Sequence, residues 1–140
     1  MALGNKKSRV KVRLDNDLAH NSLLDKKSSK LSEKIKLNKC DNILKLKDKK
    51  ILIKIDTEGY ELEVLSGMKN LASNNKLDII TEYTLKAYKK VYPLNRIKFQ
   101  LGDLFKNYSI YKIETNRLIR LNLIELLNCD EQINLFLIAN

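Results

Sequence analysis

Three acidic residues lie where two apolar runs end, and they are the side chains of this sequence best placed to do chemistry. Asp56 and Glu58 follow the run I-L-I-K-I at 51–55, and Glu82 comes at the end of a second run that starts at Leu77. In open α/β sheets, ligands bind in the crevice outside the carboxyl ends of the strands. If both runs are strands of one sheet, the three acids therefore face a site at its edge.

Each of these acids also has a structural explanation. An acid that ends a buried strand must be solvated, paired or neutralised, so the functional and structural interpretations of Asp56 have equal weight. Glu82 has a structural alternative in an ion pair with Lys54. Acids in a first helical turn favour the positive end of the helix dipole and are usually solvated, which is the state expected of Glu58, Glu61 and Glu63.

The elements that would position the acids form a strand-helix-strand unit. Residues 51–55 are apolar on both faces except for Lys54, as in a strand of a parallel sheet that is covered on both sides. Apolar residues then recur at helical spacing from Leu62 to Ala72 and predict one amphipathic helix. Residues 51–55 and 77–80 should therefore be adjacent parallel strands joined by a right-handed crossover, with Asp56 and Glu82 at the same edge.

The rest of the chain predicts further elements around this unit. Before it we expect strands at 10–14 and 34–38 and a helical turn at 41–44, with a polar loop over 15–32 that makes His20 a surface residue. After it, the apolar residues from Leu94 to Phe105 share one helix face. Strands are expected at 108–113 and 135–139, separated by a polar, Leu-rich connection.

Composition excludes several classes of protein. A length of 140 residues, 44% of them hydrophobic, suits one globular domain. Because no run approaches the roughly 20 apolar residues of a membrane span, we expect a soluble, cytoplasmic protein without a membrane partner. Cys40 and Cys129 form no metal-ligand cluster, so no metal site is predicted. The net charge of +10 is mostly lysine spread among 17 acids, which does not predict specific nucleic-acid binding.

One segment resembles a known family. The stretch K-I-D-T-E-G-Y-E-L-E-V-L-S-G at 54–67 is similar to the K-I-D-x-E-G-x-E-x-x-V-L-x-G motif of FkbM-type methyltransferases, at their fourth strand and the helix after it. I-I-T-E-Y at 79–83 resembles the fifth strand of that family, and N-L-F-L-I-A at 134–139 its closing strand. A-L-G-N at 2–5 looks like the A-L-G-D that closes the third strand near the adenine site. The segment 10–50 matches only loosely.

The resemblance implies a fold and an activity. The fold would be α/β and class I methyltransferase-like (Rossmann-like), a mostly parallel sheet without its first two strands, in a single partial domain over 1–140 with its core at 51–140. The last strand, 135–139, would run antiparallel beside 77–80, and 108–113 would be the outer edge. The activity would be O-methylation of a sugar or polyketide hydroxyl by S-adenosylmethionine.

The resemblance also gives the acids their roles. Asp56 would accept the proton of the substrate hydroxyl, and Glu58 and Glu82 would orient a hydroxyl-rich substrate. Ala2 and Leu3 would contact the adenine of the cofactor. The aromatic residues that follow the second strand either line a sugar pocket or pack in the core; these are Tyr83, Tyr88 and Tyr92.

The sequence departs from the family at its start. The family's glycine-rich loop and ribose-binding acid lie upstream of A-L-G-D, and the four glycines of this sequence contain no G-x-G. The cofactor site is therefore expected to be incomplete, as in a gene fragment, a degenerate remnant or half of a split enzyme. Strand 51–55 would then have an open edge that favours self-association. The alternative function is a non-catalytic binding module for an anionic partner.

Overall fold

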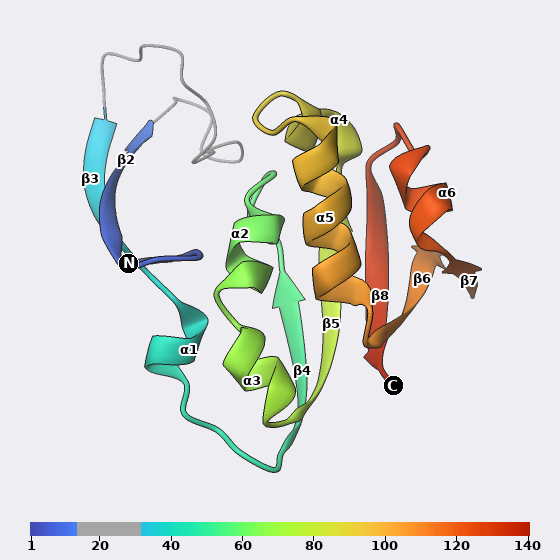
Figure 1. Ribbon diagram of the computed structural model, residues 1–140, viewed down its shortest axis with the longest axis horizontal. Coiled ribbons are helices and arrows are strands. Elements are labelled where there is room, and N and C mark those ends of the chain that lie inside the picture. Colours follow the sequence, from blue (N-terminus) through green and yellow to red (C-terminus); the bar gives the residue numbers. More distant parts are fainter. Residues whose placement is uncertain (14–31) are drawn as a thin grey trace.

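The computed structural model describes residues 1–13 and 32–140, which form two mixed sheets and the helices that pack on them (Figure 1). The first sheet has the order β1-β3-β2, with bounds Ala2–Leu3, Ser32–Asn38 and Ser8–Arg13. The second has the order β4-β5-β8-β6-β7, with bounds Lys50–Ile55, Lys76–Tyr83, Ile133–Ala139, Tyr108–Glu114 and Arg117–Leu121. The helices are α1 (Cys40–Ile43), α2 (Glu61–Ser66), α3 (Lys69–Ser73), α4 (Leu85–Lys89), α5 (Leu94–Phe105) and α6 (Leu123–Leu127).

Most of the elements expected before the strand-helix-strand unit are present. Strands β2 and β3 and the turn α1 stand where the sequence predicted them. The loop expected at 15–32 and its residue His20 lie outside the described residues, apart from Ser32, which begins β3.

The parallel pair is confirmed. Strands β4 and β5 pair in parallel, with Ile51 opposite Leu77 and Ile55 opposite Thr81. Strand β8 runs antiparallel beside β5, as the family resemblance implied. The carboxyl ends of β4 and β5 therefore meet at one edge of the sheet.

The expectation of a mostly parallel sheet is wrong for the described residues. Of the paired strands in the five-stranded sheet only β4–β5 are parallel, because β8 lies between β5 and β6 and runs antiparallel to both. Strand β6 is not the outer edge either. A tight turn at residues 115–116 returns the chain as β7, which pairs antiparallel with β6 and takes the edge position.

Strand β4 is the other edge of this sheet, and it is not covered on both faces as expected. Its residues alternate, with Ile51, Ile53 and Ile55 packed on the core while Leu52 is 61% exposed. Helices α2, α3 and α5 lie together in front of the strands (Figure 1). Within residues 1–13 and 32–140 no strand pairs with the outer side of β4, which satisfies the premise of the self-association hypothesis. Self-association itself stays a prediction. None of the described helices is long and apolar enough to cross a membrane.

The single helix predicted from Leu62 to Ala72 is two helices, α2 and α3, separated by Gly67 and Met68. The break coincides with a close backbone approach between distant parts of the chain. A Cβ atom at Gly67 would lie 2.0 Å from the carbonyl oxygen of Gly4, which is too near for any side chain. Gly67 therefore lets the segment that begins with β1 lie directly against the end of α2.

Substitution of Gly67 by alanine is expected to lower the free energy of unfolding by about 1 to 3 kcal/mol, the usual cost of overpacking. Gly102 is the matched control, because it lies inside α5 and a Cβ there would meet only Leu123 Cδ2 at 3.9 Å. Gly102→Ala should stabilise the protein by roughly 0.5 to 1 kcal/mol through helix propensity. Urea denaturation of both variants measures the two effects, and equal changes would contradict the close approach at Gly67.

Candidate active site

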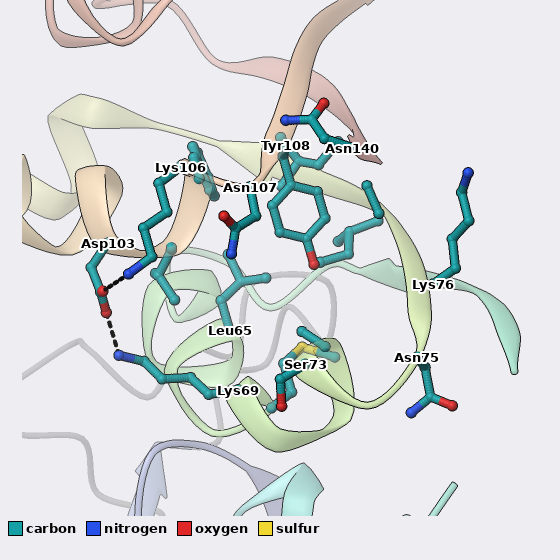
Figure 2. Close-up of a pocket in the computed structure, with 17 residues that line it drawn as sticks. Leu65, Lys69, Ser73, Asn75, Lys76, Asp103, Lys106, Asn107, Tyr108 and Asn140 are labelled. Atoms are coloured by element: carbon teal, nitrogen blue, oxygen red, sulfur yellow. Dashed lines mark hydrogen bonds and ion pairs between the residues drawn. The ribbon is translucent and has the colours of Figure 1, made fainter. Parts of the chain in front are cut away.

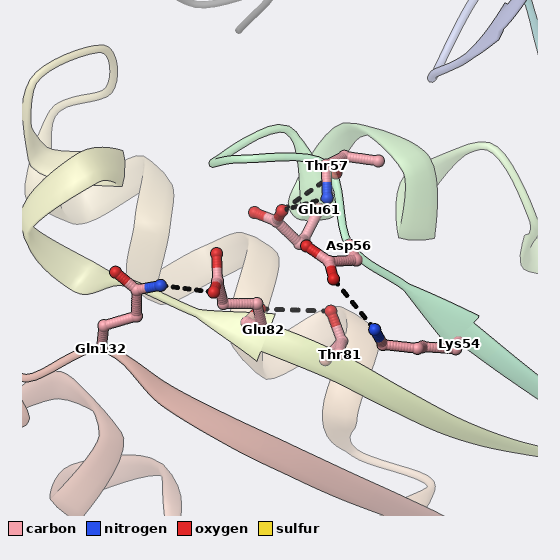
Figure 3. Close-up of polar contacts among 7 residues, drawn as sticks. All are labelled: Lys54, Asp56, Thr57, Glu61, Thr81, Glu82 and Gln132. Atoms are coloured by element: carbon pink, nitrogen blue, oxygen red, sulfur yellow. Dashed lines mark hydrogen bonds and ion pairs between the residues drawn. The ribbon is translucent and has the colours of Figure 1, made fainter. Parts of the chain in front are cut away.

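The three acids singled out in the sequence converge at the carboxyl edge of β4 and β5. Asp56 and Glu58 lie on the loop after β4, and Glu82 is the penultimate residue of β5. One carboxylate oxygen from each of the three residues lies within 4.8 Å of those of the other two. Figure 3 shows Asp56 and Glu82 extending from neighbouring strands on the same side of this edge. The shared edge predicted from the strand-helix-strand pattern is confirmed.

The nearest partners of these acids differ from the sequence expectation. Lys54 does not pair with Glu82; its Nζ atom lies 2.9 Å from Oδ2 of Asp56, and both side chains are exposed. Glu82 instead accepts a hydrogen bond from the side-chain amide of Gln132, just before β8 (Figure 3). Sequence reasoning missed Gln132, because its proximity depends on β8 pairing with β5 from fifty residues away.

Glu82 binds its proton more tightly than an ordinary glutamate. Partial burial raises the pKa of Glu82, and repulsion from Glu58, Glu61 and Asp56 raises it further, while the hydrogen bond from Gln132 lowers it. Carboxylates that share a site disfavour one another's charge. The edge is therefore a group of acids that is ready to hold a proton or to surround a positively charged or hydroxyl-rich molecule.

This repulsion predicts a pH-dependent effect of Glu82→Gln. Because the folded state raises the pKa of Glu82, its contribution to stability is present at low pH and is lost as the pH rises through the folded pKa. At pH 7 the glutamine variant should be more stable by roughly 0.5 to 1 kcal/mol, the scale of one like-charge contact in water. Thermal unfolding between about pH 4 and pH 7 measures the difference, which should shrink toward the acid end.

Glu114→Gln provides a control of opposite sign. Hydrogen bonds from Arg117 and Lys112 lower the pKa of Glu114, so its stabilising effect is present at neutral pH and is lost as the pH falls. The glutamine variant should therefore be the less stable protein at pH 7. We call the group formed by Asp56, Glu58 and Glu82 the acidic edge. If Glu82→Gln were also less stable than the parent at pH 7, crowding of negative charge at the acidic edge would be contradicted.

The loop that carries Asp56 and Glu58 is held by a buried carboxylate. Glu58 and Gly59 have positive φ angles of 52° and 96°, so the chain turns sharply there. Oε1 of Glu61 accepts hydrogen bonds from the backbone N–H groups of Thr57 at 3.0 Å and Gly59 at 3.1 Å. It also accepts one from the Thr57 hydroxyl at 2.9 Å (Figure 3). Glu61 therefore fixes the conformation of this loop.

The expectation that Glu61 and Glu63 are solvated is wrong: they are 1% and 3% exposed. Oε1 of Glu63 accepts hydrogen bonds from the Tyr92 hydroxyl at 2.6 Å and from Nη2 of Arg96 at 3.3 Å. Its other oxygen accepts one from the side-chain amide of Asn5. These donors explain how a carboxylate is buried without being left unpaired. They also join α2 to α5 and to the segment after β1.

The tyrosines of this region pack in the core. Tyr83, Tyr88 and Tyr92 are 1%, 1% and 9% exposed, which favours the packing alternative over a sugar pocket. The Tyr88 hydroxyl donates to Oε2 of Glu61 at 3.2 Å, and the Tyr83 hydroxyl donates to the carbonyl of Leu126 at 2.8 Å. Burial raises the pKa of both phenols. They therefore serve as neutral hydrogen-bond donors.

Ala2 and Leu3 form β1, which pairs in parallel with the end of β3. The next residues tie this strand to α2, through the Gly4–Gly67 approach and the bond from Asn5 to Glu63. The contact of Ala2 and Leu3 with the adenine of a cofactor stays a prediction.

A comparison with protein families decides the identity of the chain. The model that describes the methyltransferase FkbM domain matches residues 13–123. The chain belongs to the FkbM methyltransferase domain family. Searches among curated proteins and among solved structures found no match.

The matched range of the FkbM domain contains the whole acidic edge, including Asp56, Glu58 and Glu82. Ala2 and Leu3 precede it, and β8 follows it. Membership of the FkbM family implies a methyltransferase that depends on S-adenosylmethionine. The Rossmann-like class of the fold follows from this membership, since the described strands by themselves form mixed and mostly antiparallel sheets.

The glycines of this chain do not form a glycine-lined cradle that could hold such a cofactor, because each of them has another role. A Cβ at Gly4 would meet the side chain of Leu37 at 3.0 Å, Gly67 packs on Gly4, and Gly102 lies within α5. Gly59 serves the turn after β4. The feature that the described residues contribute at this end of the sheet is therefore the acidic edge.

Proposed function

We propose that this chain supplies the substrate-facing side of an FkbM-type O-methyltransferase, which acts on a hydroxyl of a sugar or polyketide-like molecule. The main support for the proposal is that Asp56, Glu58 and Glu82 converge at the carboxyl edge of the parallel pair β4–β5. One carboxylate oxygen of each residue lies within 4.8 Å of those of the other two. In sheets of this class that edge is where ligands bind. When bound, S-adenosylmethionine would supply the methyl group.

Asp56 has the position of the proton acceptor. Lys54 contacts its Oδ2 atom, and no described residue donates a hydrogen bond to Oδ1. The side chain is 49% exposed, so a substrate hydroxyl can reach it from solvent. If the substrate oxygen is methylated, its hydroxyl proton would pass to the Asp56 carboxylate. Positioning and proton acceptance are the contributions expected from the protein in this reaction.

Glu58 and Glu82 have positions suited to orienting the substrate. Carboxylates of this kind can accept hydrogen bonds from sugar-like hydroxyl groups, and the bond from Gln132 holds the Glu82 side chain beside the site. The acidity of this edge disfavours an anionic ligand there, so an anionic partner would have to bind elsewhere on the chain.

The proposal is tested by methyl transfer. The full polypeptide that carries this sequence is incubated with methyl-tritiated S-adenosylmethionine and a panel of sugars and polyketide alcohols. Each acceptor is paired with its deoxy analogue. Transfer to one hydroxyl, absent with the matching deoxy compound, is the expected result. Label that enters no hydroxyl acceptor, or enters amines instead, would contradict the proposal.

A further inference from the structure

A cavity lies at the opposite end of β5 from the acidic edge. It is a cavity of 710 Å³ between α3, the end of α5 and the strand ends at Lys76, Tyr108 and Ala139 (Figure 2). Strand β5 begins at Lys76 and carries Glu82 at its far end, so the two sites lie at different edges of the sheet. The volume falls within the range of roughly 300 to 1,000 Å³ that is typical of small-molecule pockets.

The inner wall of this cavity is apolar. Leu65, Met68, Ile79, Phe105 and Leu137 line it, and each is a buried member of the hydrophobic core. These side chains come from α2, the α2–α3 connection, β5, α5 and β8. Ala72, Leu104 and Tyr108 also line the cavity and are only partly buried, so they offer accessible apolar surface to a ligand in front of this buried wall.

The rim of the cavity is cationic. Lys69, Lys76 and Lys106 line it together with a single acid, Asp103. Lys69 and Lys106 both bind the Asp103 carboxylate, Lys106 through a contact of 3.1 Å to Oδ1 (Figure 2). In the 140-residue chain, the carboxylate of Asp103 and the terminal carboxylate of Asn140 offset two of the three ammonium groups, so the rim keeps one excess positive charge. Neutral polar side chains also lie at the rim, those of Asn107 and Asn140.

We infer that this cavity binds a small amphipathic anion, with its apolar chain on the inner wall and its charged group at the lysine rim. The combination of an apolar wall and an uncompensated cationic rim selects this class over neutral or cationic amphiphiles. The inference does not depend on methyl transfer, because none of the residues involved belongs to the acidic edge.

The test uses two probes with the same apolar chain and opposite charge, dodecanoate and dodecyltrimethylammonium. Binding of each to the 140-residue chain is measured by calorimetry below its micelle concentration. Dodecanoate should bind at a single site, and the cation should bind at least about fivefold more weakly, the scale of one close charge contact in water. Equal binding of both probes, or no binding of dodecanoate at millimolar concentration, would overturn the inference.

Two substitutions locate the site. Asp103→Asn releases Lys69 and Lys106 from their shared carboxylate and should tighten dodecanoate binding by about three- to fivefold. Asp130→Asn is the matched control, since it removes the same charge from an exposed ion pair with Lys89 outside the cavity. It should leave the affinity unchanged. Equal effects of the two substitutions would place the anion elsewhere and overturn the assignment.

Discussion

Glu61→Ala is expected to lower the free energy of unfolding by about 3 kcal/mol, the largest stability loss predicted for a single side chain in this protein. The carboxylate is 1% exposed and accepts hydrogen bonds from Thr57, Gly59 and Tyr88. Alanine would leave these donors without their acceptor in the interior. The loop that positions Asp56 and Glu58 would lose its attachment to α2.

Two further variants separate this cause from general damage to the helix. Glu61→Gln keeps an oxygen that can accept the hydrogen bonds from Thr57 and Gly59. Its free energy of unfolding should therefore fall by less, about 1 kcal/mol. Glu131→Ala changes an exposed glutamate and should stay within about 0.5 kcal/mol of the parent. Urea unfolding gives all three values. If Glu61→Ala lowered the free energy of unfolding no more than Glu131→Ala does, the buried hydrogen bonds of Glu61 would not stabilise the loop.

The positions of the acids could be predicted, whereas the burial of some of them could not. The shared position of Asp56 and Glu82 follows directly from two apolar runs joined by one helical segment, since that pattern brings the carboxyl ends of the strands together. Glu61 and Glu63 are glutamates like Glu82, and their side chains were expected in solvent. Their donors on Tyr88, Tyr92 and Arg96 come 27 to 33 positions later in the chain, so charge and spacing alone gave no sign of them.

Two features of the fold were missed for similar reasons. The break between α2 and α3 accompanies the contact of Gly67 with Gly4, which no local pattern predicts. Strand β7 has the sequence R-L-I-R-L, and the turn before it at 115–116 has neither glycine nor proline to mark it. The edge strand therefore looked like part of a polar connection. Local periodicity identified the buried strands, while contacts between distant segments decided the edges.

Asp56→Asn is expected to lower the rate of methyl transfer by about 10²- to 10⁴-fold, the usual contribution of a positioned general base. The amide has nearly the shape of the carboxylate but cannot accept the hydroxyl proton. Folding should be little affected, because the side chain is 49% exposed and its ion pair with Lys54 is of the surface kind that contributes about 0 to 1 kcal/mol. Substrate binding should change less than the rate of the chemical step, since hydrogen bonding to a hydroxyl remains available to the amide.

The most direct test of the account is the single-turnover rate of tritiated methyl transfer to a hydroxyl acceptor, measured for the full polypeptide, for Asp56→Asn and for Asp130→Asn. Asp130 is the matched control, because it too is an exposed aspartate paired with a lysine, at 3.2 Å from Lys89, but it lies away from the acidic edge. The account predicts a loss of at least about a hundredfold for Asp56→Asn and an unchanged rate for Asp130→Asn. Equal rates for the two variants would contradict the assignment of Asp56 and of the acidic edge as the site of methyl transfer.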